Sequence, residues 1–390
     1  MVGIGLARFA YTPLIPPLVT KGWLAASEAA YIGAANLAGY LTGALLARRM
    51  AAHVPAATVL RVMMLTATAA FLACGVRLSF PWFFVWRFAS GVAGGVLMVL
   101  AATTVLPHVA PARRGLAGGV IFTGVGLGIA ASGTLVPLLL RLGLAATWYG
   151  LGALSLVLTL LAWTGWPEAS SPPEAAMSPE NSAPRRTAVG AICLEYGLSA
   201  VGLVPHMIFL VDFIARGLGQ GLEVGALYWV LFGFGAAVGP MIFGHAADRF
   251  GFGPALRAGL AIEAAAVVLP AMSAGPVSLC VSSLLVGAFT PGIVPLVLGR
   301  IRERLPADGG VQQAAWSRAT MAFALGQAAA AYGFSFLFAA GGEYPALFEL
   351  GAGALLLALA IDVMSALRST PADLRDGSAT GTEACRSGRS

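Results

Sequence analysis

The chain has 390 residues, of which 58% are hydrophobic and only 10% are charged. Because an average soluble domain has roughly 25% charged residues, this composition excludes an ordinary soluble protein. The net charge of +6 would suggest nucleic-acid binding in a soluble chain. Here the basic residues lie in short segments between apolar stretches, where they orient membrane helices, and we expect no nucleic-acid partner.

Apolar stretches follow one another along the chain, each near the ~20 residues that one bilayer crossing requires. They predict an all-α membrane protein with about twelve transmembrane helices in two pseudo-symmetric six-helix bundles. The N-terminal spans are expected at 1–20, 27–47, 57–76, 81–106, 115–140 and 144–166. The C-terminal spans are expected at 188–214, 223–245, 254–273, 275–298, 312–338 and 344–366. The first stretch starts almost at Met1, which predicts a truncated first helix.

The domain organisation follows from the composition between these spans. Residues 1–166 form the predicted N-terminal bundle and 188–367 the C-terminal bundle. Residues 167–187 are rich in Pro, Ser, Ala and Glu without apolar periodicity, which predicts a disordered cytoplasmic linker. Residues 368–390 have the same character and are expected to form a disordered cytoplasmic tail.

The basic residues fall unevenly on the two sides of the predicted membrane. If the N-terminus is cytoplasmic, only Lys21, Arg77, Arg141 and Arg216 lie on the opposite side, and most of the other arginines lie in or near cytoplasmic segments. The positive-inside rule therefore predicts that both termini are cytoplasmic. Arginine almost replaces lysine and alanine is abundant, which suggests the inner membrane of a bacterium.

The two halves resemble each other, as expected for a transporter built from repeats. Gly5 to Pro13 matches Gly197 to Pro205, and the pair Leu127 and Gly128 matches Leu325 and Gly326. Gly43 before Arg48 likewise matches Gly244 before Arg249.

Two motifs resemble signatures of the major facilitator superfamily. Residues 244–251 read GHAADRFG and are similar to its G-x-x-x-D-R-x-G loop, while 87–91 read RFASG and are similar to its R-x-x-x-G motif. Residues 3–14 and 195–210 resemble the YbfB/YjiJ-type bacterial branch. The resemblance covers the whole chain and implies a secondary transporter without indicating its substrate.

The sequence departs from the superfamily pattern in two places. Ala47 stands where the first-half copy of the loop motif would carry an acid, so a gating ion pair is not expected there. The fifth span carries several glycines but lacks the Gly-Pro pair typical of drug antiporters in this superfamily. Drug export is therefore less favoured.

Two arginines lie inside apolar spans, where each must face a wet cavity or an anionic partner, since an arginine at mid-helix costs about 2.5–3.5 kcal/mol on insertion scales. They are Arg8, with Tyr11 one helical turn further on, and Arg87, which the family resemblance links to proton coupling. Two guanidiniums favour binding of a carboxylate or another anion. The alternatives are a purely structural role for Arg87 and an interfacial anchor for Arg8.

The seventh span carries a polar stripe: Glu195, Ser199, Gly202 and His206 recur at i, i+4, i+7 and i+11. The stripe is expected to face the central pathway, with Glu195 as a proton or substrate site, or as a salt-bridge partner of an arginine such as Arg8. His206 is alternatively a packing residue. Glu263 in the ninth span is expected to pair with a neighbouring helix or to face the interface.

Further candidates complete the predicted site. Possible contacts to substrate come from Asn36, Tyr40, Trp229 and Gln327. The cytoplasmic gate is assigned to Gly244, Asp248, Arg249 and Gly251, with Asp248 meeting the N-terminus of a neighbouring helix. Glycines four residues apart are expected to let helices approach closely: Gly39/Gly43, Gly91/Gly95, Gly124/Gly128 and Gly235/Gly239.

These features predict a monomeric secondary transporter that moves a small solute by alternating access, driven by the proton gradient, with a small organic anion as the favoured substrate. A drug or metabolite exporter of the same fold is the nearest alternative. A membrane-embedded enzyme is disfavoured, because the chain has no H-E-x-x-H, G-x-S-x-G or P-loop motif. A sensor would need a large soluble domain. No cofactor and no metal site is expected.

Overall fold

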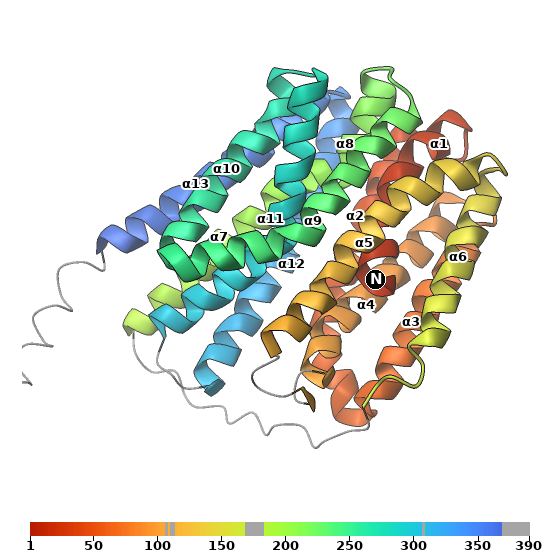
Figure 1. Ribbon diagram of the computed structural model, residues 1–390. Helices are drawn as coiled ribbons and strands as arrows, with labels where there is room; N and C mark the ends of the chain where they lie inside the picture. Colours follow the sequence, from red (N-terminus) through yellow and green to blue (C-terminus); the bar gives the residue numbers. More distant parts are fainter. Residues whose placement is uncertain (106–107, 110–113, 168–182, 306–308, 369–390) are drawn as a thin grey trace, which may run out of the picture.

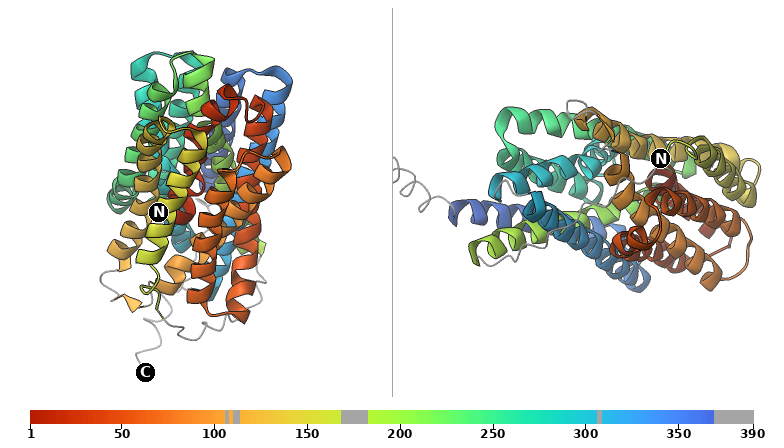
Figure 2. Two further views of the ribbon diagram at one scale, coloured as in Figure 1. Left: turned by 90° about the vertical axis from the view of Figure 1, so that its right-hand side faces the viewer. Right: turned by 90° about the horizontal axis from the view of Figure 1, so that it is seen from below.

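The computed structural model describes residues 1–105, 108–109, 114–167, 183–305 and 309–368 (Figure 1). Within these residues, 12 helices are long and apolar enough to cross a membrane. They form two sets of six that lie side by side, with the N-terminal set in red to yellow and the C-terminal set in green to blue (Figures 1 and 2). The predicted two-bundle architecture is confirmed.

The N-terminal bundle contains η1 (Val2–Leu6), η2 (Phe9–Leu14), α1 (Ile15–Thr20), α2 (Ala26–His53), α3 (Ala56–Cys74), α4 (Phe80–Val105), α5 (Arg114–Leu140) and α6 (Leu144–Leu161). The C-terminal bundle contains α7 (Ala183–Val204), η5 (Pro205–Phe209), α8 (Leu210–Asp212), η6 (Phe213–Gly217), α9 (Leu222–Phe250), α10 (Phe252–Met272), α11 (Pro276–Arg304), α12 (Gly309–Gly341) and α13 (Tyr344–Arg368). The seventh span thus begins inside the expected linker, at Ala183. Residues 168–182 of that linker and 369–390 of the expected tail lie outside the described residues.

The first helix of each bundle is irregular. The span Val2–Thr20 passes from a π segment to a 3₁₀ segment that contains Pro13, and becomes α-helical only at Ile15. The seventh span changes to a π segment at Pro205. Proline has no N–H to donate and its ring crowds the preceding turn, so the regular ladder of hydrogen bonds stops there. Both irregular segments lie opposite each other at the centre, where the Thr12 hydroxyl donates to the backbone carbonyl of Met207.

Close helix crossings inside each bundle depend on glycine. A Cβ on Gly39 or Gly43 of α2 would clash with the backbone of α4, and one on Gly91 or Gly95 of α4 would clash with the backbone of α2. In the other bundle, Gly235 and Gly239 of α9 meet the backbone of α11 in the same way, which confirms the predicted role of these glycine pairs.

Two pairs of long helices form the most extensive contacts between the two bundles. On one side α5 packs on α9, where a Cβ on Gly126 would clash with the backbone at Ala237. On the other side α2 packs on α12, with the rings of Tyr31 and Tyr332 6.4 Å apart. The central helices η2 and η5 lie between these two seams and contact each other across the bundle interface.

Candidate functional site

A small cavity lined by both polar and apolar side chains lies at the interface of the two bundles. The N-terminal bundle contributes most of its lining: Arg8, Phe9, Tyr11, Thr12, Gly33, Asn36, Leu37 and Arg87. Met207 and Ile208 of η5 close it from the C-terminal bundle. Its volume of about 20 Å³ is enough for roughly one water molecule. In this structure the cavity is therefore too small for an organic solute.

Arg87 is the most deeply buried charged group of the cavity, with 2% of its surface exposed. Its Nη1 donates to the carbonyl of Ala7 at 2.7 Å, and its guanidinium lies 4.8 Å from the ring centroid of Tyr11. The Ala7 carbonyl, which also accepts from the Ser90 hydroxyl, lies where the first span changes from a π to a 3₁₀ segment. The ring face of Tyr11 adds a cation–π contact, and no carboxylate in the described part of the chain forms an ion pair with Arg87.

Arg8 lies between the rings of Tyr40 and Phe9, with its guanidinium carbon 4.9 and 5.2 Å from their centroids. Its Nη2 donates to the sulfur of Met207 at 3.6 Å. Among the described residues no acid pairs with it either. The cavity therefore combines two cations with aromatic rings and weak acceptors, an environment in which an anion is favoured.

The remaining cavity candidates have fixed positions around these arginines. Asn36 donates from Nδ2 to the carbonyl of Arg87 at 3.0 Å, and the Tyr11 hydroxyl donates to the carbonyl of Ala29 at 2.8 Å. Gln327 of α12 reaches the site through Met207, donating from Nε2 to its sulfur at 3.2 Å. Six predicted residues, Arg8, Tyr11, Asn36, Tyr40, Arg87 and Gln327, thus line or adjoin one place.

Trp229 of α9 stands beside this group. Its ring stacks on Phe232 with centroids 4.8 Å apart, and lies 6.0 Å from that of Phe9. Its indole N–H donates to the hydroxyl of Ser132 on α5 at 3.2 Å. Trp229 therefore joins α5 to α9 and supports the wall of the cavity through Phe9.

The polar stripe of the seventh span faces a different way from the one predicted. Gly202 packs against Leu355 of α13, and Ser199 donates to the carbonyl of Tyr196 in its own helix. His206 bonds the Ser282 hydroxyl of α11 at 2.7 Å and lies edge-on to Phe348. The stripe is buried inside the C-terminal bundle because small and hydroxyl-bearing side chains also suit close helix packing.

Glu195 lies near an arginine cluster, not near Arg8. Its electrostatic neighbours are Asp362, Arg304, Arg300 and Arg257. The suspected pairing with Arg8 is absent from the described structure. One carboxylate oxygen of Glu195 has no hydrogen-bond partner, although the side chain is buried.

The arginine cluster ties three helices together at one end of the C-terminal bundle. Asp362 of α13 is fully buried and accepts from Arg257 Nε at 2.6 Å, Arg300 Nη2 at 2.8 Å and Arg304 Nη2 at 3.3 Å. Glu303 adds a bond to Arg300 at 3.1 Å. The cluster joins α10, α11 and α13 of one bundle.

Of the residues assigned to the gate, Gly244, Asp248 and Arg249 lie in the last two turns of α9, and Gly251 lies between α9 and α10. Asp248 and Arg249 are exposed, and Arg249 lies over the ring of Phe250 at 5.7 Å. Gly251 has a φ of +85°, a left-handed conformation that favours glycine, and its N–H caps the end of α9 at Ala247. Gly244 has open space around its α-carbon. In the described structure Asp248 contributes no ion pair, so the role of these residues in gating remains a prediction.

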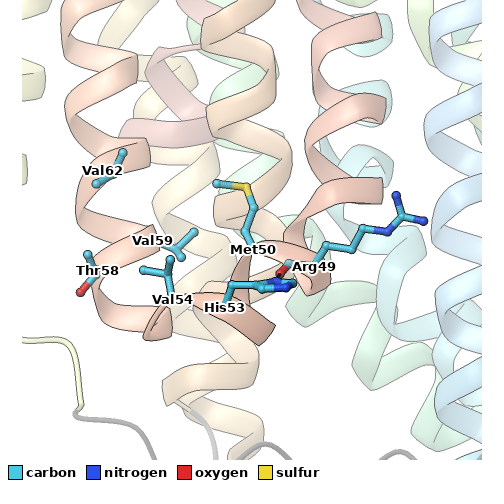
Figure 3. A pocket seen from close by; sticks show the side chains of 7 residues that line it. All are labelled: Arg49, Met50, His53, Val54, Thr58, Val59 and Val62. Atoms are coloured by element: carbon cyan, nitrogen blue, oxygen red, sulfur yellow. Dashed lines mark hydrogen bonds between the residues drawn. The ribbon is translucent and has the colours of Figure 1, made fainter.

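Two other features lie away from the centre. Glu263 of α10 is buried, and neither of its carboxylate oxygens has a partner among the described residues, so the expected pairing with a neighbouring helix is absent there. A second hollow of about 370 Å³ lies at the turn between α2 and α3, lined by Arg49, Met50, His53, Val54, Thr58, Val59 and Val62 (Figure 3). It is mainly apolar and has no group of converging polar atoms. It is not a candidate binding site.

Sequence reasoning did not identify Met207, Ile208 or Asp362. The first two are apolar and carry no sequence signal for a cavity, although Pro205 marks the irregular turn that presents them. Asp362 is a single acid within an apolar span, and its three arginine partners are distant in sequence. An isolated acid in a membrane span was a signal that could have found it.

The comparisons agree with this architecture. Residues 1–363 match a family model described as "Uncharacterised MFS-type transporter YbfB". No curated protein matches the sequence. A crystal structure of a D-xylose-proton symporter is similar at 16% identity with a TM-score of 0.72, covering 92% of this chain and 94% of that chain. The xylose transporter XylE from E. coli in an inward open conformation gives 14% identity and a TM-score of 0.71, covering 92% of both chains.

A bacterial homologue of the human lysosomal transporter Spinster has the same fold, at 14% identity and a TM-score of 0.61, and covers 93% of this chain and 92% of that chain. The identities are low, so these structures establish the fold alone. The family match covers nearly the whole chain, and the signature motifs at 87–91 and 244–251 agree with it. The chain is a multi-pass membrane protein and belongs to the YbfB-type family of major facilitator superfamily transporters.

Proposed function

We propose that this protein transports a small organic anion through the central cavity. The observation that carries the proposal is the pair of cavity arginines, Arg8 and Arg87, with no carboxylate paired to either in the described structure. Unneutralised guanidiniums inside a membrane protein are costly, and a bound anion would offset that cost. A neutral sugar or a cationic drug would leave both charges uncompensated.

Alternating access is the proposed mechanism. The small cavity lies between two bundles that meet along α5/α9 and α2/α12, and glycine gives the first of these seams a smooth surface. Rocking of one bundle against the other would open the cavity to each side in turn. We further propose that both termini are cytoplasmic and that the transporter acts as a monomer, with 1–166 and 188–367 as its two moving units.

Proton coupling is the proposed energy source. One structural neighbour is described as a D-xylose-proton symporter, which supports coupling by analogy of fold. The candidate proton carrier in this chain is Glu195, a buried carboxylate with one unpartnered oxygen, close to three arginines. Protonation of Glu195 would change the charge balance of that cluster, and with it the packing of α7 against α11.

The test is a transport assay in proteoliposomes with a lumenal pH dye, using a panel of small carboxylates, neutral sugars and cationic drugs. Wild type is expected to give substrate-dependent proton movement with carboxylates. Arg8→Gln and Arg87→Gln are expected to abolish transport, while Arg141→Gln, an exposed arginine in the loop after α5, is the matched control. Transport of sugars or cationic drugs in preference to carboxylates would contradict the proposal.

A second variant separates coupling from transport. Glu195→Gln keeps the size of the side chain and removes its titratable group. We expect it to retain exchange of labelled substrate across the membrane but to lose proton movement. If Glu195→Gln still moves protons with substrate, another group carries them.

A further inference from the structure

Four buried polar atoms around the central cavity have no hydrogen-bond partner in the described structure. Two are donors, the Nε atoms of Arg8 and Arg87, and two are acceptors, the amide oxygens of Asn36 and Gln327. Arg87 and Asn36 are each 2% exposed and Gln327 is 1% exposed. Buried polar groups in proteins are nearly always paired, so four orphans around one cavity point to a ligand that would pair with them.

The amide oxygens are acceptors by necessity. Asn36 must direct its NH₂ toward the carbonyl of Arg87, which can only accept, and this leaves its oxygen free. Gln327 directs its NH₂ at the sulfur of Met207, which is also an acceptor. The amide oxygen of Gln327 is therefore left without a donor. The site therefore presents cationic donors and neutral acceptors together. A ligand that satisfies both needs anionic oxygens and at least one O–H or N–H group.

The positive charge of the site further restricts the class of ligand that can bind. An amino acid would bring its ammonium group close to two guanidiniums, where like charges repel. A hydroxyl group supplies the donor without that repulsion. On Arg8, Nε is free and Nη2 is held only by a thioether, so the edge of the guanidinium that binds a carboxylate through two parallel bonds is available.

The Met207 sulfur contacts donors that a carboxylate could bind. Its sulfur accepts from Arg8 on one side and from Gln327 on the other, and a thioether is a weak acceptor. A cavity of about 20 Å³ holds roughly one water and no organic acid, so a side chain must move on binding. Methionine is unbranched and flexible, and its movement would release both donors at once.

We propose that the central site binds a small hydroxylated monocarboxylate, whose carboxylate displaces the Met207 sulfur from Arg8 and whose hydroxyl donates to the amide oxygen of Gln327 or Asn36. Met207 is the positioning residue, because its sulfur holds the donors of Arg8 and Gln327. This inference rests on the proposed transport of an anion, and adds the hydroxyl requirement and the role of Met207.

The experiment measures binding to purified protein with radiolabelled lactate and propionate, which differ by one hydroxyl, and with lactamide, which lacks the charge. Wild type is expected to bind lactate roughly 3–10-fold more tightly than propionate, the range of one net hydrogen bond, and to bind lactamide too weakly to measure. One of the two variants Gln327→Leu and Asn36→Leu is expected to bring the ratio of lactate to propionate affinity close to one, and a wild-type ratio in both variants would overturn the hydroxyl contact to these amide oxygens. Gln220→Leu, in the exposed loop before α9, is the control.

The Met207→Leu variant tests the positioning role, because leucine keeps the volume of the side chain and cannot accept from Arg8. Affinity for both acids is expected to rise by roughly 2–5-fold, since a competing weak bond is gone. A size-exclusion profile equal to that of wild type shows that each variant is folded. Unchanged affinities in folded Met207→Leu would overturn the positioning role.

The outcomes separate this inference from the proposed function. Equal binding of lactate and propionate by wild type overturns the hydroxyl requirement and leaves anion transport standing. Displacement of bound lactate by inorganic phosphate at lower concentration than by unlabelled lactate overturns the carboxylate assignment. Binding of sugars or cationic drugs without any carboxylate refutes the proposed function itself.

Discussion

Replacing Asp362 by Asn should destabilise the C-terminal bundle, because its fully buried carboxylate forms ion pairs with three arginines. It accepts from Arg257 at 2.6 Å, Arg300 at 2.8 Å and Arg304 at 3.3 Å. Asparagine has nearly the same size and retains one acceptor oxygen, but carries no charge. The substitution therefore isolates the electrostatic contribution of this group from its packing.

The expected cost follows from how far each arginine can reach solvent. The side chain of Arg257 is 34% exposed and can turn to water, whereas those of Arg300 and Arg304 are only 9% and 14% exposed. Removing one partner of a buried ion pair costs about 3–5 kcal/mol. At roughly 2–4 °C per kcal/mol for a unit of this size, the apparent melting temperature should fall by about 6–20 °C.

The measurement is the fraction of detergent-solubilised protein that stays monodisperse on size exclusion after heating. Glu349→Gln, an exposed acid on the same helix, provides the control and should leave the melting temperature unchanged. A shift below about 2 °C for Asp362→Asn would mean that the three arginines are stabilised by water or lipid, and would refute the reasoning.

Three further changes test other contacts by the same heating assay. Gly91→Val places a side chain against the backbone of α2 and should prevent recovery of monodisperse protein. The control Gly353→Val lies on α13 with open space around it and should be tolerated. Equal recovery of both variants would contradict the role of glycine at the crossing of α2 and α4. Tyr11→Phe keeps the ring under Arg87 but loses the bond to the Ala29 carbonyl, which should cost about 1 kcal/mol and lower the melting temperature by roughly 2–4 °C. Asp212→Asn removes the charge and one of the two acceptor oxygens that Arg216 and Tyr344 share, and should cost about 1–3 kcal/mol; no change in melting temperature would show that this group contributes little.

The candidate site was partly predictable. Arg8 and Arg87 stood out because a charge inside an apolar span is costly wherever the helix lies, and both line the cavity. The polar stripe through Ser199 and His206 was assigned to the wrong surroundings, because helical periodicity shows which residues share a face but does not identify the helix that covers it.

The sequence by itself determined the number of membrane spans, the two-bundle plan and the glycine crossings, because each depends on local features: the length of an apolar run, the repetition of a pattern, or the absence of a side chain. Only the tertiary structure decided which groups meet. Met207 reaches Arg8 because two proline-containing segments, far apart in the chain, lose regular helical geometry opposite each other. Asp362 pairs with three arginines because of tertiary packing as well. The packing of α10, α11 and α13 brings charges that are distant in sequence into one apolar environment, where they must pair.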